Sequence, residues 1–266
     1  MIGFEYIKNW NFGIGIFFTT FLSFLSFISF LGLGRKLMNL FKLSIDGKWN
    51  FCFRLLLGIF SISFIVQILS ISKIVDQKFY EIFIMLLSLF GIYELRFLKI
   101  KNIKLDRSNS IPILILIIIF SERYIFALLP TTKMDEIAYH MLLPARVLID
   151  NGLKYYSLPW EASILQHMQY QFISIPYYSI GFPEVPNLIS LFIFISLIFV
   201  ILNLIKSNNK NKNIILWSAI FLSCGLGSLV EFTTNASNSL LYFSTTLGVV
   251  FLVSLSNEYI KNNLMS

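Results

Sequence analysis

The chain has 266 residues, of which 56% are hydrophobic and only 13% are charged. This composition excludes an ordinary water-soluble domain, in which about a quarter of the residues carry charge. The net charge of +7 would suit a nucleic-acid-binding protein, but the basic residues are concentrated in short connections between apolar runs. We therefore interpret the charge as a signal of membrane orientation and expect no nucleic-acid partner.

Seven apolar runs approach the roughly 20 residues that a helix needs to cross a hydrocarbon core. Each is expected to be helical, because an open strand would leave its amides unpaired in lipid. The first run has no basic region before it and no cleavage site after it, so it is predicted to be a span rather than a removable signal. The fold class is predicted to be an all-α integral membrane protein with about seven transmembrane helices, at residues 12–33, 55–71, 79–95, 111–129, 188–205, 214–230 and 240–255.

Basic residues follow a regular alternation along these spans. Most of the 21 lysines and arginines lie in the connections 33–54, 96–110 and 206–213, which the positive-inside rule assigns to the cytoplasm. The amino terminus, the turn near Asp76 and residues 131–187 are then predicted on the non-cytoplasmic side of the plasma or inner membrane. Cys52 and Cys224 lie in or beside spans and are expected to be packing residues.

The connection 131–187 is the one long loop. Six of the seven prolines and both histidines lie in it or beside it, and its aromatic and aliphatic content argues against disorder. Residues 135–149 and 163–174 carry apolar side chains at helical spacing, which predicts short amphipathic helices at the outer membrane surface. Pro144 is expected to kink or divide the first helix, and residues 150–152 are expected to end it.

Candidate chemistry begins directly after the fourth span. Asp135 and Glu136 are followed by Tyr139 and His140. A carboxylate here can act as a proton acceptor, but Asp135 with Thr132 also forms a variant of the capping box, and the two roles can coexist. Glu136 and His140 share one helix face, where they can hold a divalent metal ion or form an ordinary surface pair.

The string Asp-Glu-x-x-Tyr-His-x-x-x-Pro, just outside a membrane helix, resembles the first external loop of GT-C type glycosyltransferases. It is closest to bacterial members related to the protein mannosyltransferases and the lipid A aminoarabinose transferases. The resemblance covers residues 111–187. It implies transfer of a sugar from a polyprenyl-phosphate carrier at the outer membrane face, with Asp135 as base or metal ligand and Glu136 beside it. Residues 1–110 would then be an amino-terminal three-helix extension and residues 111–266 the GT-C-like region.

Further residues are candidates for binding the substrate. Arg123, within the fourth span, and Arg146 can hold the phosphate of a lipid carrier, although Arg123 can equally snorkel to the membrane surface. Tyr139 and His140 are candidates through the resemblance. Placed donors and aromatic faces suit a sugar site, but each of the following is individually more typical of a structural role: His167, Tyr170 and Gln171. Glu231 is a candidate for a second acidic residue on the same face.

An alternative from another class stays open. GT-C members usually have more spans after the loop than the three predicted here, so the chain can also be a truncated, inactive relative. It can equally be a non-catalytic polytopic protein, either a transporter or an assembly subunit for surface polysaccharide in the cell envelope. A transporter is expected to show polar residues or paired Gly/Pro breaks in mid-membrane, and Pro112 near the start of one span does not provide them.

Overall fold

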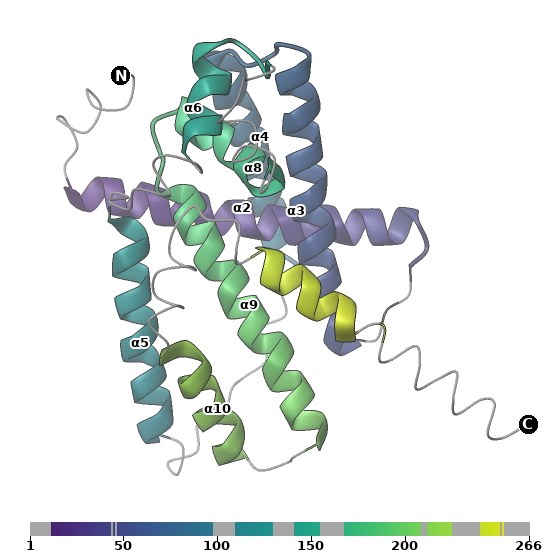
Figure 1. The fold of residues 1–266 in the computed structure, drawn as a ribbon, viewed down its shortest axis with the longest axis vertical. Coiled ribbons are helices and arrows are strands. Elements are labelled where there is room, and N and C mark those ends of the chain that lie inside the picture. The colour runs from purple at the N-terminus through teal and green to yellow at the C-terminus, as the bar shows by residue number, and fades with distance from the viewer. Residues whose placement is uncertain are drawn as a thin grey trace, which may run out of the picture.

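The computed structural model describes residues 12–43, 45, 47–97, 110–129, 141–154, 168–208, 212–224, 240–250 and 252. Every regular element among them is a helix (Figure 1), which confirms the all-α prediction for this part of the chain. The helices are α2 (Phe12–Leu40), α3 (Gly47–Ile71), α4 (Gln77–Leu95), α5 (Ser110–Leu128), α6 (Leu142–Ile149), α8 (Met168–Ser179), α9 (Val185–Asn208), α10 (Lys212–Cys224) and a last helix at Leu240–Val250.

Among the described residues, four helices are long and apolar enough to cross a membrane. They are Gly15–Leu40 in α2, Trp49–Ile71 in α3, Ser110–Leu128 in α5 and Val185–Leu204 in α9. α4 is 19 residues long but contains Lys78, Glu81 and Glu94. α10 has 13 residues, or about 20 Å of helix, and its predicted continuation over 225–230 lies outside the described residues. The structure therefore bears out several candidate spans, but not the predicted number of about seven.

Two helices extend further than predicted at the ends that carry basic residues. α2 continues past residue 33 to Leu40, and α3 begins at Gly47 instead of residue 55. The sequence predicts Arg35 and Arg54 in a connection, because one apolar run ends at residue 33 and the next begins at residue 55. Arg35 lies in the helix because its guanidinium pairs with the buried carboxylate of Glu94 at 2.8 Å.

Close backbone approaches hold α2 against α3 and α4. A Cβ atom at Gly58 would overlap the carbonyl oxygen of Phe30, and one at Gly34 would overlap that of Arg54. Small residues at such crossings allow helix backbones to touch, which is how helices associate where lipid removes the hydrophobic driving force. The three helices therefore form one tightly packed unit.

The helices do not form a bundle of parallel rods. In Figure 1, α2 runs across the molecule, whereas α3, α5 and α9 run along its long direction. Seven spans of one bilayer would be tilted only moderately from a common direction. The placement of α2 differs from that expectation, and the glycine contacts with α3 explain how the two helices can cross closely.

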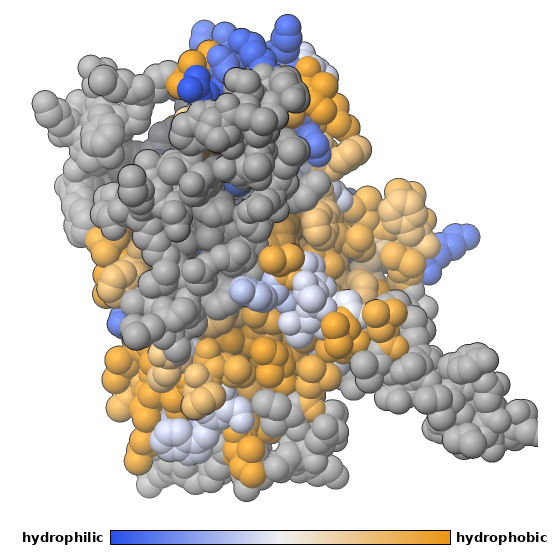
Figure 2. Space-filling view, viewed as in Figure 1, coloured by the Kyte–Doolittle hydropathy of each residue, from blue (hydrophilic) through white to orange (hydrophobic). Residues whose placement is uncertain are grey.

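Large apolar side chains cover much of the outer surface. Phe221 is 83% exposed and Ile111 is 67% exposed. Figure 2 shows hydrophobic surface over the lower part of the molecule and hydrophilic surface at the top, near α6 and the adjoining end of α3. Soluble monomers rarely expose contiguous apolar surface on this scale. The distribution is the one expected of helices that face lipid.

α6 ends as predicted. Asn151 has a φ of 51° and Gly152 a φ of 140°, and the Gly152 amide donates to the carbonyl of Val147 at 2.9 Å. This arrangement satisfies carbonyl groups at a helix carboxyl end. Pro144 lies in the first turn of α6, where its missing N–H costs no helical hydrogen bond. The first part of the helix predicted over 135–149, residues 135–140, lies outside the described residues, so the predicted kink or division at Pro144 is not tested.

α8 differs from the amphipathic surface helix predicted over 163–174. It begins at Met168, and residues 163–167 lie outside the described residues. Gln171, assigned to the polar side, is fully buried, as is Phe172. α8 packs against α3, α4, α6 and α9. The prediction was wrong for this segment because helices distant in sequence cover its polar side, which periodicity alone does not reveal.

Candidate functional site

The central residues of the predicted site lie outside the described residues. The proposed metal ligands Asp135, Glu136 and His140 are among these residues. What the structure describes is the frame around them: α5 ends at Leu128 before the acidic string, and α6 begins at Leu142 after it. The site residues outside the described part of the chain are Asp135, Glu136, Tyr139, His140, His167 and Glu231.

Arg123 is placed in the structure, and its surroundings differ from those of a snorkelling side chain. Its side chain is only 3% exposed, and its Nη2 atom donates to the carbonyl oxygen of Ser223 at 2.8 Å. Ser223 belongs to α10, and a hydrogen bond from a charged donor to a carbonyl is among the stronger ones. Arg123 therefore links α5 to α10 and does not snorkel to a surface.

Arg146 lies in a contrasting position. It belongs to the last turn of α6 and its side chain is exposed. Leu143 and Val147, on the adjoining side of the helix, are both fully buried. α6 thus presents an arginine outward from a firmly packed base, as a binding site for an anion requires.

The end of α6 is anchored to the end of α3. The amide of Leu153 donates to the carbonyl of Ser70 at 2.8 Å, and a Cβ atom at Gly152 would lie 2.9 Å from both Ser70 O and Lys73 Cγ. These contacts join the long connection to the turn that precedes α4. Both segments are predicted on the same side of the membrane, so the packing agrees with that part of the topology.

Two tyrosine hydroxyls of α8 are bonded within the protein, one to α9 and one to α2. The Tyr170 hydroxyl donates to the carbonyl of Pro186, and the Tyr177 hydroxyl donates to Ser26 Oγ at 2.6 Å. Burial raises the pKa of Tyr177, so this hydroxyl keeps its proton. Tyr170 and Gln171 are both fully buried, and their structural interpretation is favoured over a sugar-binding one.

Glu184 is a candidate that sequence reasoning missed. It directly precedes α9, and its carbonyl accepts a hydrogen bond from the amide of Leu188 at 3.2 Å. Burial raises the pKa of its carboxyl group, a property common among proton-transferring groups. The sequence signal that could have drawn attention to Glu184 is its place between Pro183 and Pro186, because prolines mark the start of a helix.

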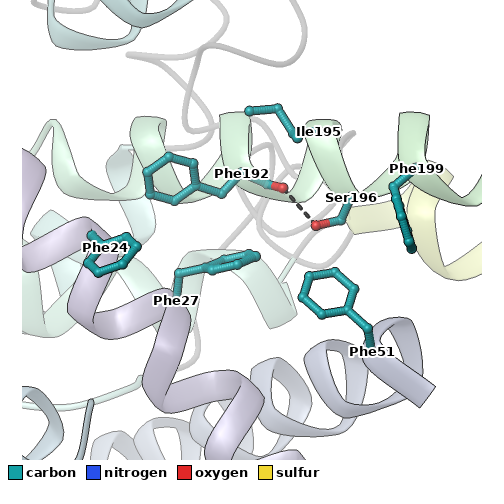
Figure 3. Close-up of a pocket in the computed structure, with 7 residues that line it drawn as sticks. All are labelled: Phe24, Phe27, Phe51, Phe192, Ile195, Ser196 and Phe199. Atoms are coloured by element: carbon teal, nitrogen blue, oxygen red, sulfur yellow. Dashed lines mark hydrogen bonds between the residues drawn. The ribbon is translucent and has the colours of Figure 1, made fainter. Parts of the chain in front are cut away.

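A cavity of about 510 Å³ lies between α2, α3 and α9 (Figure 3). Its walls consist largely of phenylalanine rings, and its Ser196 hydroxyl is bonded to the carbonyl of Phe192 at 2.9 Å. A sugar site needs placed polar groups, so this cavity suits hydrocarbon. The lining residues are Phe24, Phe27, Phe51, Phe192, Ile195, Ser196 and Phe199.

Within the described ranges, no group of three or more His, Cys, Asp or Glu side chains is placed to hold a metal ion. Cys52 is buried, as expected of a packing residue, whereas Cys224 is exposed. The chain matches no protein-family model, no curated protein and no solved structure.

Proposed function

We propose that the chain is an integral membrane glycosyltransferase of the GT-C type, acting at the non-cytoplasmic face. One observation carries the proposal: the acidic string beginning at Asp135 stands between a candidate span, α5, and the packed helix α6. This is the position of the acidic residue in the family that the string resembles. A carboxylate in this position would be held near the membrane surface by both flanking helices.

The proposed reaction needs little acid–base machinery. The anomeric carbon of the donor forms a bond to an acceptor hydroxyl, and its bond to the carrier phosphate breaks, leaving polyprenyl phosphate with the electron pair. Asp135 accepts the hydroxyl proton as attack proceeds. Glu136 lies beside it, and the exposed Arg146 would attract the phosphate. A divalent metal ion at Asp135, Glu136 and His140 is a further part of the proposal.

Two packing contacts support the sides of the membrane that are proposed for the connections. The contact of Leu153 with Ser70 joins two segments expected outside. At a different site, the ion pair of Arg35 with Glu94 joins two segments whose connections are expected in the cytoplasm. A chain in which either pair lay on opposite sides of a bilayer could not form these contacts.

The test compares the release of polyprenyl phosphate from a sugar-loaded carrier by wild type and Asp135→Asn. Loss of the proton acceptor should reduce turnover about 100-fold or more, while asparagine still caps a helix and costs at most about 1 kcal/mol of stability. Asp76→Asn is the matched control, because Asp76 is exposed at the start of α4 with no side-chain capping bond. It should leave turnover unchanged.

Two results would count against the proposal. Equal turnover by wild type and Asp135→Asn would reduce Asp135 to a helix cap. No release by correctly folded wild type, across hexose and pentose donors with and without Mg²⁺ or Mn²⁺, would favour the non-catalytic membrane protein or the inactive relative.

A further inference from the structure

Basic side chains from three helices meet at one end of the α2–α3–α4 unit. This basic cluster consists of Arg35, Lys36, Arg54 and Arg96. Arg35 pairs with Glu94 at 2.8 Å, and Glu94 is only 4% exposed. Gly34 packs directly on the backbone of Arg54, which places the arginines of α2 and α3 next to each other. The cluster unites residues from the two connections 33–54 and 96–110.

Aromatic rings support the cations of the basic cluster. The Arg35 Cζ atom lies 3.6 Å from the ring centre of Phe97, and the Arg96 Cζ atom lies 3.4 Å from that of Tyr93. The Lys36 Nζ atom lies 5.7 Å from the ring centre of Phe90. A guanidinium group stacked on a ring keeps its N–H donors in its own plane. Such donors remain suitably directed for a phosphate group.

Positive charge exceeds negative charge here. In the part of the chain that the structure describes, the ion pairs are Arg35 with Glu94 and Lys154 with Asp150. One carboxylate therefore stands against four cations, and both Lys36 and Arg96 are exposed. Like charges at short distance repel, more strongly where the surroundings are apolar. An anion bound at the exposed edge would lower this repulsion.

The surroundings of the basic cluster specify the kind of anion. Tyr93 and Phe97 are 44% and 45% exposed, and Leu40 and Phe41 at the end of α2 are 73% and 64% exposed. Apolar side chains next to unpaired cations match a molecule with an anionic head and hydrocarbon tails. Basic clusters at the cytoplasmic ends of membrane helices bind anionic lipids for this reason.

We propose that the basic cluster binds the headgroup of an anionic phospholipid in the cytoplasmic leaflet. Lys36 and Arg96 contact the phosphate, Arg35 and Arg54 supply the surrounding positive field, and the exposed rings contact the upper acyl chains. This inference rests on the membrane-integral part of the proposed function and is independent of sugar transfer. An inactive Asp135→Asn protein should bind the lipid normally.

The test reconstitutes the purified chain in mixed micelles with phosphatidylglycerol or phosphatidylcholine and measures lipids retained by native mass spectrometry. Wild type should retain phosphatidylglycerol preferentially. The double variant Lys36→Gln/Arg96→Gln should weaken that retention about fivefold per cation, or roughly 25-fold in all. The control Lys73→Gln/Lys78→Gln removes the same charge from exposed residues at the opposite end of α3 and α4 and should change retention little.

A third variant, Tyr93→Leu, keeps every charge but removes the ring under Arg96. It should weaken retention less than the double variant does. The proposal fails if wild type retains both lipids equally, or if the control variant loses as much affinity as the double variant. It also fails if inorganic phosphate, at the concentration of the lipid headgroup, displaces the bound lipid, because the site would then recognise a free anion.

Discussion

Gly91→Ala is the change that most sharply tests the packing of α4 on α2. An added Cβ atom would lie 2.5 Å from the carbonyl oxygen of Leu25 and 2.7 Å from Ser29 Oγ, whereas ordinary contact begins at 3.4 Å. The helices would have to separate by about 0.9 Å, which is an overpacking change that costs about 2 kcal/mol. Ser29 would also lose its bond to the carbonyl of Leu87, now 2.5 Å long.

The remaining contributions to this prediction are smaller. A hydrogen bond between membrane helices is worth about 0.6 kcal/mol on average. Alanine is favoured over glycine inside a helix by about 0.9 kcal/mol, which opposes the other two effects. Together these effects should lower the free energy of unfolding by about 2 kcal/mol, which lowers the melting temperature by roughly 4–8 °C for a chain of this size.

Gly248→Ala is the matched control, because a Cβ atom at this position meets nothing within 4 Å. It should raise stability through helix propensity alone. Tryptophan fluorescence during heating in detergent follows unfolding, and Trp49 and Trp217 both lie in helices. If Gly91→Ala were stabilised as much as Gly248→Ala, α4 could not approach α2 as described.

Three more substitutions have defined outcomes. Burial raises the pKa of Glu184, so above pH about 4.3 the folded chain binds more protons than the unfolded chain. The free energy of unfolding therefore falls as the pH rises from there through the pKa of the folded state. Glu184→Gln should flatten this fall when melting curves are recorded across the pH range. Glu94→Gln should cost about 2 kcal/mol in thermal unfolding, because it leaves Arg35 without its carboxylate. Arg123→Leu should cost about 1–2 kcal/mol through the lost bond to Ser223; unchanged stability with lost turnover would instead indicate phosphate binding.

Apolar length made the principal helices predictable. α5 lies within one residue of its predicted bounds at each end, and α4 ends where predicted. Hydrophobic runs of this length have few alternatives to helix. The end of α2 was not predictable, since Arg35 is accommodated by an ion pair with Glu94 of α4, which is distant in sequence.

The candidate site was predictable only as a set of residue types. Local sequence identified the acidic string and the stop of α6 at Gly152, because both depend on neighbouring residues. The burial of Gln171 depends on the helices packed against α8, and the contact of Arg123 depends on α10; no local pattern connects these residues to those helices. The basic cluster also required the fold, although its members had already been recognised as orientation signals.

The proposed function depends most on α3 crossing a bilayer with the α6 region on the non-cytoplasmic side. Single cysteines at Asn39, Ser72 and Lys154, all exposed, in a chain lacking Cys52 and Cys224, can be labelled in intact cells with a membrane-impermeant maleimide. Ser72 and Lys154 should react equally, because their segments contact each other, and Asn39 should react only after permeabilisation. Equal labelling of all three before permeabilisation would contradict the membrane crossing and, with it, the placement of Asp135 outside.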